Sequence, residues 1–278
     1  MFLFSSPRLQ ADQPPQEQIP GQSKTMPQLD TYPKNASLQQ RIAIVIPVYN
    51  HQQMIRQVVL DALKLEVPVI VVDDGSTDES RSRIQDIPGI RVLAHKRNQG
   101  KGAALRTGFS AAAEIADWAA TIDADGQHDP TELRSLFRAV PDDCRPIVLG
   151  IREEMGSREV PWTSRFGREF SNFWVWIAGG RKVADSQNGF RIYPLPESLQ
   201  LNVVSSRYQF EVEILVKAMW SRLPIVEVPI SVNYCPGEQR ISHYRPFVDF
   251  LRNSAVFNRL IWKRILRAFH LPISYKTF

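Results

Sequence analysis

Two aspartates with a single residue between them, Asp123 and Asp125, have the spacing that most directly indicates chemistry in this chain of 278 residues. They lie in the segment Asp-Ala-Asp-Gly-Gln-His at 123–128, directly after the predicted strand 119–122. Two carboxylates on one turn can hold a divalent cation such as Mg²⁺ or Mn²⁺. Such a cation neutralises the charge that develops on phosphate oxygens as a nucleoside diphosphate departs. The alternative is a polar turn that caps a helix beginning at Pro130, because Asp and Gly are common turn residues.

A second acidic turn, Asp-Asp-Gly-Ser-Thr-Asp at 73–78, follows another apolar run, 67–72. The Asp74 carboxylate could accept hydrogen bonds there from a base or a ribose. The turn at 98–102 is not a phosphate-binding P-loop, because Lys101 is followed by Gly rather than by Ser or Thr. Lys101 could face an anion at a helix start, but we expect a solvated lysine.

Glu211 and Glu213 are two residues apart on a predicted helix and therefore do not share a face. At most one of them can point at a site formed by the acidic turns. Ordinary charges on a helix surface are the alternative for both.

Strand and helix patterns alternate along the first half of the chain and predict how these turns are positioned. The predicted strands are 42–46, 67–72, 91–94, 118–122 and 146–149, and the predicted helices between them are 52–64, 100–115 and 130–140. This order predicts an α/β fold with a mostly parallel, doubly wound sheet flanked by helices. Ligands bind at the carboxyl ends of the strands in such sheets, where both acidic turns lie. Beyond residue 150 we expect helices at 163–179, 209–220 and 247–270, a strand at 225–232 and a loop at 185–191.

The composition is that of one globular catalytic domain with a polar tail. Residues 1–40 are rich in Gln, Pro and Ser and predict a disordered tail, followed by a domain at 41–245 and a C-terminal amphipathic helical segment at 246–278. The net charge of +5 is mild and indicates an anionic partner without specifying it. Cys144 and Cys235 are too few and too far apart for a zinc site or a redox pair, so we expect ordinary thiols in a reducing compartment.

No run reaches the roughly 18–20 apolar residues of a membrane span, and residues 1–4 are too short a run for a signal peptide. We therefore expect a cytoplasmic location.

Five motifs together resemble those of family 2 glycosyltransferases of the GT-A fold. They are IPVYN at 46–50, VVDDGSTD at 71–78, NQGKGAALRTGF at 98–109, DADGQH at 123–128 and DSQNGFR at 185–191. The likeness covers 42–150, extends in weaker form to about 250, and within the family points to dolichyl-phosphate or polyprenyl-phosphate mannosyl- and glucosyltransferases.

The resemblance implies which residues bind a nucleotide-sugar donor. The positions that match the family's nucleoside-binding residues are Pro47, Tyr49, Val72 and Asp74, with Asn50 standing where many relatives have Glu. The positions that match the ribose, metal and diphosphate site are Asp123, Ala124, Asp125 and Gln127, and Arg152 matches an arginine near the diphosphate.

On the acceptor side, the segment 185–191 resembles the family's acceptor loop. Asp185 could act as general base towards a hydroxyl acceptor. A phosphate acceptor is already ionised and needs no base, in which case Asp185 and Gln187 position it and Arg191 binds its charge. A purely structural turn is the alternative. Arg240 and His243 lie where polyprenyl-phosphate relatives carry a Gly-x-Ser-Lys motif that closes over the donor; His243 replaces the Lys, and Arg240 could supply the cation.

The resulting hypothesis is an inverting, metal-dependent hexosyltransferase with Asp125, Asp185 and Arg191 as catalytic residues. It would use a UDP- or GDP-sugar and a polyprenyl-phosphate lipid, or alternatively a glycolipid or polysaccharide hydroxyl in cell-envelope glycan synthesis. A nucleotidyltransferase and a non-catalytic nucleotide-binding scaffold are the rival functions, and no nucleic-acid partner is expected.

Segments 166–176 and 250–269 mix aromatic and cationic residues as interfacial helices do, which predicts peripheral contact with the cytoplasmic face of a membrane.

Overall fold

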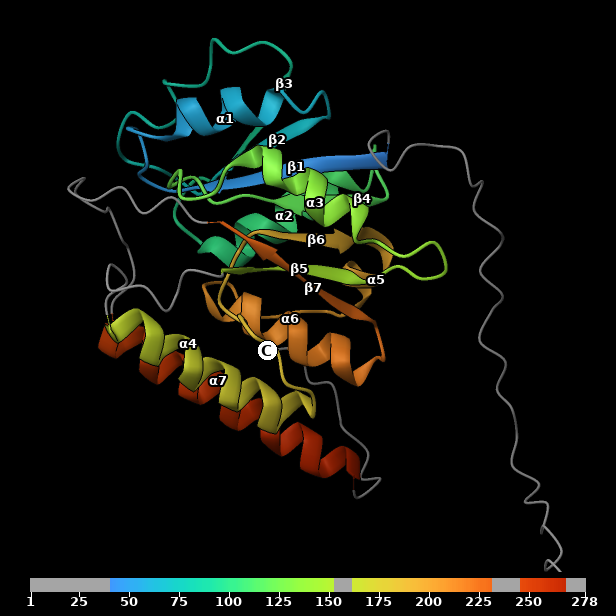
Figure 1. Cartoon of the computed structure of the whole chain (residues 1–278). Helices are drawn as coiled ribbons and strands as arrows, with labels where there is room; N and C mark the ends of the chain where they lie inside the picture. Colours follow the sequence, from blue (N-terminus) through green and yellow to red (C-terminus); the bar gives the residue numbers. More distant parts are fainter. Residues whose placement is uncertain (1–40, 153–161, 232–245, 269–278) are drawn as a thin grey trace, which may run out of the picture. The chain divides into compact units, whose positions relative to one another are not determined.

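A seven-stranded sheet forms the centre of the structure, a computed structural model that describes residues 41–152, 162–231 and 246–268 (Figure 1). Its strands lie in the order β3-β2-β1-β4-β6-β5-β7, and β6 alone runs antiparallel to its neighbours β4 and β5. The strands are β1 (Ile42–Val48), β2 (Val69–Asp73), β3 (Ile90–Ala94), β4 (Trp118–Thr121), β5 (Ile147–Arg152), β6 (Arg191–Pro194) and β7 (Ile225–Ile230). The predicted fold class, a mostly parallel sheet flanked by helices, is confirmed.

Helices cover both faces of this sheet (Figure 1). They are α1 (Ile55–Leu63), α2 (Lys101–Ala112), the short 3₁₀ turn η2 (Pro130–Glu132), α3 (Leu133–Arg138), α4 (Trp162–Gly179), α5 (Leu195–Gln200), α6 (Gln209–Trp220) and α7 (Pro246–Ala268). The side chains of β1 alternate between two hydrophobic cores, because successive residues of a strand point to opposite faces. Ile44 packs with α1 and α3, whereas Val45 packs with α2 and α6. Burial of each such side chain stabilises the fold by about 1.5–3 kcal/mol.

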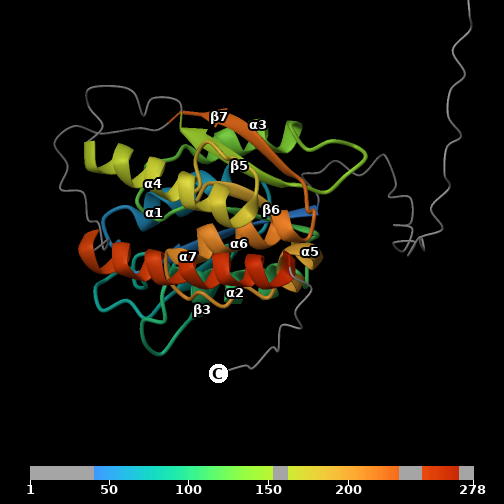
Figure 2. The same ribbon diagram turned by 90° about the horizontal axis from the view of Figure 1, so that it is seen from below.

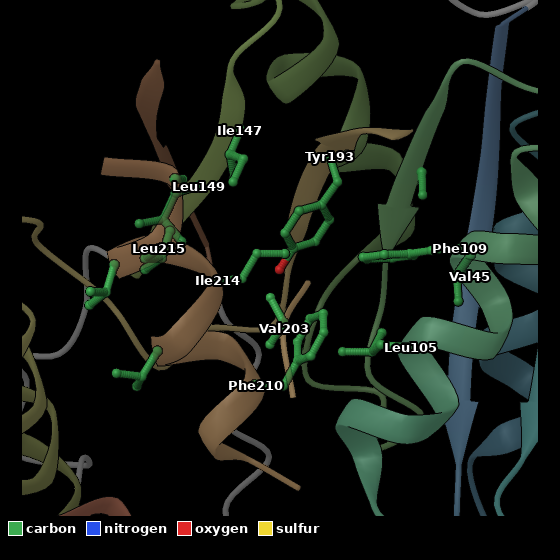
Figure 3. Close-up of a cluster of buried hydrophobic side chains, with 14 of the residues drawn as sticks. Val45, Leu105, Phe109, Ile147, Leu149, Tyr193, Val203, Phe210, Ile214 and Leu215 are labelled. Carbon is green, nitrogen blue, oxygen red and sulfur yellow. The ribbon is translucent and has the colours of Figure 1, made fainter. Parts of the chain in front are cut away.

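Helix α2 packs unusually close to β1. A Cβ atom added at Gly108 would lie 2.3 Å from Cγ1 of Val45, so only glycine allows this approach. Next to it, the Phe109 ring lies 4.9 Å from that of Tyr193 and 6.0 Å from that of Phe210, centroid to centroid. Figure 3 shows these three rings converging from α2, β6 and α6. The second half of the chain is thereby fixed against the first.

Helices α4 and α7 lie side by side and pack against α6 (Figures 1 and 2). Phe257 of α7 stacks on Trp174 of α4 at 6.2 Å. Arg259 of α7 donates to Glu213 of α6 at 2.8 Å. The buried sides of α4 and α7 therefore join the core that α6 shares with the sheet.

The predicted strands and helices are all present within a few residues of their expected bounds. The structure adds β6 and α5, which the sequence did not predict. β6 contains only four residues, begins with Arg191 and ends with Pro194, so it lacks the apolar run typical of a buried strand. Cys144 is a free thiol, as expected, whereas Cys235 and the predicted tail at 1–40 lie outside the described residues.

The sheet order places both acidic turns at one edge. β2, β1 and β4 are parallel neighbours, so the segments that follow their carboxyl ends lie next to one another. β5 runs in the same direction as β4 because β6 is antiparallel to both. β6 in turn begins at this edge. The segments that follow β1, β2, β4 and β5, and the segment that precedes β6, can therefore contribute to one site.

Candidate active site

The predicted nucleoside-binding residues come together at the ends of β1 and β2. Pro47 pairs with Val72 in the parallel register, and the Asp74 amide donates to the Val48 carbonyl at 2.8 Å. Asn50 follows with a positive φ of 54° and accepts a hydrogen bond from the Thr77 amide at 2.8 Å. The loops after the two strands are thereby tied to each other. Tyr49 lies in this joined region, directly before Asn50.

Asp74 organises the turn that begins α2. Its side chain is buried, and its two oxygens accept hydrogen bonds from the backbone amides of Gln99 at 2.9 Å and Gly100 at 2.6 Å. Nδ1 of His95 lies 2.7 Å from the same carboxylate. The carboxylate thus holds the turn from which Lys101 projects. Its predicted contact with a nucleoside stays a prediction.

Lys101 is not solvated, contrary to our expectation. Its ammonium lies 2.6 Å from Oδ1 of Asp123 and 2.5 Å from Oε1 of Glu211, and only 16% of its side chain is exposed. Burial lowers the pKa of Lys101, but the charges of the two carboxylates outweigh it and leave the pKa raised. The expectation was wrong because the local sequence predicts an exposed lysine at the start of a helix. Tertiary packing instead brings the buried carboxylate of Glu211, on α6, against Lys101.

The two glutamates of α6 point to different places, as their spacing indicated. Glu211 reaches Lys101, whereas Glu213 bonds to Lys217 at 2.9 Å and to Arg259. Both are almost fully buried, so the alternative of ordinary surface charges is wrong. Only Glu211 belongs to the site.

Gly189 makes room for this charged group. A Cβ atom added there would lie 2.7 Å from Nζ of Lys101, 2.8 Å from Oδ2 of Asp123 and 2.9 Å from Oε1 of Glu211. The backbone of the 185–190 loop therefore covers the three charges directly. Any side chain at this position would push them apart.

The turn at 123–125 does not cap the following helix. That cap comes from Asp129, whose Oδ1 accepts from the Thr131 amide at 2.8 Å. Oδ1 of Asp125 accepts from the Gln127 amide at 3.1 Å within the turn itself. Burial and the charge of Asp123 raise the pKa of Asp125. A cation bound to both carboxylates would relieve this repulsion.

Arg152 and Asp185 form a bidentate ion pair. Nε of Arg152 donates to Oδ2 of Asp185 at 2.6 Å, and an η nitrogen donates to Oδ1 at 3.0 Å. Asp185 is fully buried. The structure thus joins the residue expected near the donor diphosphate to the one expected near the acceptor.

Arg191 lies wholly inside the protein. Its guanidinium donates to the carbonyls of Asn188 at 2.6 Å, Ser186 at 2.8 Å and Glu211 at 2.9 Å. These bonds fix the 185–190 loop to α6. Its predicted role in binding an acceptor anion stays a prediction.

His128 completes the site from the segment after β4. Its side chain is only 7% exposed, and its ring stacks on Phe190 at 4.9 Å between centroids. Burial lowers the pKa of His128 and outweighs the opposing charges of Asp123 and Asp125, so the imidazole is neutral at neutral pH.

From the sequence, Lys101 and one of the two glutamates were candidates for the site, but neither was included in the predicted site. The position of Lys101 at a predicted helix start is a weak signal for a binding role. For Glu211 the only signal was the face of the predicted helix on which it lies. Arg240 and His243, which we expected to close over the donor, lie outside the described residues.

Residues 43–194, more than half of the chain, match the family model described as "Glycosyl transferase family 2". A UDP-N-acetylglucosamine–dolichyl-phosphate N-acetylglucosaminyltransferase from Methanococcus voltae is 30% identical over 215 residues, which cover 69% of this chain and 86% of the relative. The chain belongs to glycosyl transferase family 2.

This glycosyltransferase is similar to a second named enzyme in sequence and to a solved structure in fold. A polyprenol monophosphomannose synthase from Mycolicibacterium smegmatis is 29% identical over 212 residues, covering 69% of this chain and 77% of the relative. The crystal structure of mannosyl-3-phosphoglycerate synthase from Rubrobacter xylanophilus superposes with a TM-score of 0.59 at 15% identity, over 86% of this chain and 78% of the other. The expected GT-A fold is confirmed. The family membership confirms the assignment as an enzyme over the scaffold alternative.

Proposed function

We propose that this glycosyltransferase moves one sugar, with inversion, from a nucleoside diphosphate sugar to a polyprenyl-phosphate lipid. The observation that carries the proposal is the pair Asp123 and Asp125 at the carboxyl end of β4, with Asp123 bound to Lys101. The ion pair of Arg152 with the buried Asp185 lies at the same edge of the sheet. The names of the two relatives, one a dolichyl-phosphate and the other a polyprenol enzyme, support the choice of acceptor. They differ in the sugar, so the proposal leaves the sugar open.

A divalent cation, Mg²⁺ or Mn²⁺, fits the two aspartates. In the part of the chain that the structure describes, no group of three or more His, Cys, Asp or Glu side chains forms a metal site. Two carboxylates completed by phosphate oxygens are the ligand set that Mg²⁺ commonly uses. When bound, the cation neutralises charge on the departing diphosphate. Asp123 and Asp125 would hold it, and Lys101 fixes the orientation of Asp123.

The pairing of Asp185 supports a phosphate acceptor over a hydroxyl acceptor. Both of its oxygens accept hydrogen bonds from Arg152. A general base must instead direct an oxygen at the proton that it removes. A lipid phosphate is ionised at neutral pH and attacks without such a base. In this function Asp185 holds Arg152, and Arg152 offers positive charge to the reacting phosphates.

The test is transfer of labelled sugar into lipid. Purified protein with Mn²⁺ is incubated with each of a panel of labelled UDP- and GDP-sugars, with and without polyprenyl phosphate. We expect one donor to label the lipid phase only when the lipid is present, and EDTA to abolish the labelling until Mn²⁺ is restored. NMR of the product should show the anomeric configuration inverted. Failure of every donor to label the lipid, or a reaction that is indifferent to EDTA, would contradict the proposal.

The outer sides of α4 and α7 support peripheral contact with a membrane. Phe173 of α4 is 49% exposed and Trp262 of α7 is 64% exposed, in helices that also carry exposed Arg165, Arg264 and Arg267. None of the helices within the described ranges combines the length and apolar character needed to cross a bilayer. Aromatic and cationic side chains together are typical of helices that lie in the interface. We include binding to the cytoplasmic leaflet in the proposed function.

Replacing Phe173 and Trp262 together by serine should weaken binding to vesicles that contain phosphatidylglycerol by about tenfold or more, because the exposed rings no longer enter the interface. Co-flotation with the vesicles measures it. Ile115→Ser is the matched control, since Ile115 is equally exposed at 52% but lies outside both helices. Equal flotation of the double variant and the wild-type protein would refute membrane contact through these helices.

A further inference from the structure

His128 carries a buried polar atom that the protein itself does not satisfy. Among the described residues, Nδ1 of His128 is buried and has no hydrogen-bond partner. Buried polar groups nearly always have partners, so an exception in a native site requires an explanation. A group that is unpaired in the free protein and satisfied by a ligand is one such explanation.

The ring of His128 is held in place rather than left to rotate. It stacks on Phe190 with an interplanar angle of 25°. Phe190 is fully buried, and its amide donates to Oδ1 of Asn188 at 3.2 Å. The side-chain amide of Asn188 in turn donates to the Gly150 carbonyl at 2.8 Å. The plane of the imidazole is therefore set before any ligand arrives.

The surroundings of His128 place it beside the proposed transfer site. Its ring stacks on Phe190, which directly follows Gly189, and a Cβ atom added at Gly189 would lie 2.8 Å from Oδ2 of Asp123. In the sheet, β4 has β1 on one side and β6 on the other. The predicted nucleoside-binding residues lie at β1 and β2, whereas the partner of His128, Phe190, directly precedes β6. His128 thus lies on the side of the acidic turn away from the nucleoside.

We propose that Nδ1 of His128 forms a hydrogen bond with a hydroxyl group of the transferred sugar and positions it for attack. A hydroxyl both donates and accepts, so it can pair with Nδ1 in either tautomer of the neutral imidazole. The inference rests on the proposed use of a nucleoside diphosphate sugar. It makes His128 a positioning residue that recognises the sugar rather than the nucleotide.

The experiment compares two ligands on three variants. Calorimetry with Mn²⁺ measures the affinity for the free nucleoside diphosphate and for the intact nucleotide sugar, without acceptor. His128→Phe keeps the stack on Phe190 and removes both nitrogens. His128→Asn keeps a polar atom two bonds from Cβ, as Nδ1 is, and His128→Gln places it three bonds away, as Nε2 is.

We expect His128→Phe and His128→Gln to lose about tenfold in affinity for the nucleotide sugar, the loss of one hydrogen bond. Affinity for the free nucleoside diphosphate should stay within about twofold, and His128→Asn should recover most of the loss. An unchanged affinity of His128→Phe for the nucleotide sugar would overturn the inference. So would an equal loss for both ligands, which points to the diphosphate or to a structural role. Since no acceptor is present, a failure of lipid transfer would leave this result standing.

Discussion

Asp125→Asn is expected to lower the rate of sugar transfer on the order of a thousandfold, equal to about 4 kcal/mol of transition-state stabilisation. Asparagine keeps the size of the side chain and can still accept from the Gln127 amide, so the turn should persist. It removes the negative charge that would hold the cation against the departing diphosphate. The measurement is initial transfer into the lipid phase, with Mn²⁺ affinity in the presence of donor as a second readout.

Asp129→Asn is the matched control for this prediction. It makes the same chemical change four residues along, at an exposed N-cap that accepts from the Thr131 amide. Asparagine and aspartate are similarly good at such caps. This control should therefore keep nearly full activity. Transfer by Asp125→Asn within tenfold of wild type, at equal stability, would mean that Asp125 does not hold the metal.

Lys101→Met should reduce the free energy of unfolding by about 3–5 kcal/mol, the usual consequence of removing one partner from a buried ion pair. Methionine fills a similar volume, so the loss comes from charge. Asp123 and Glu211 would be left as two neighbouring carboxylates without their common cation. Gly189 holds the backbone directly over them and limits their separation. The midpoint and slope of urea denaturation provide the measurement.

Lys217→Met is the matched control on the same network of helices. Lys217 bonds to Glu213 at 2.9 Å, but Glu213 keeps its bonds to Arg259 at 2.8 Å and to the Ser205 amide at 3.0 Å. Its loss should thus cost about 1 kcal/mol. Adding Glu211→Gln to Lys101→Met should recover part of the stability, because one uncompensated carboxylate is then removed. If Lys101→Met is no less stable than Lys217→Met, the ion pairs of Lys101 with Asp123 and Glu211 do not stabilise the fold as the geometry indicates.

Much of the sheet and the position of the acidic turns could be predicted from the sequence. The run Ile42–Val48 is buried at every position, which is typical of a strand covered on both faces. Asp74 and Asp123 each come directly after such a run, so they must lie where the chain leaves the core. The same reasoning failed for β6, whose four residues carry no apolar run and whose place depends on antiparallel pairing with β4 and β5.

What the sequence by itself determined, then, is the fold class and the edge of the sheet at which the chemistry lies, because apolar periodicity acts over a few neighbouring residues. Only the tertiary structure decided which charges meet. Lys101 and Glu211 are 110 residues apart, and Arg152 and Asp185 are 33 apart. No local pattern encodes these pairs, since they depend on β6 and α6 bringing the second half of the chain against the first. The resemblance to relatives indicated the donor site, and the packing around Gly189 and Phe190 gave it its geometry.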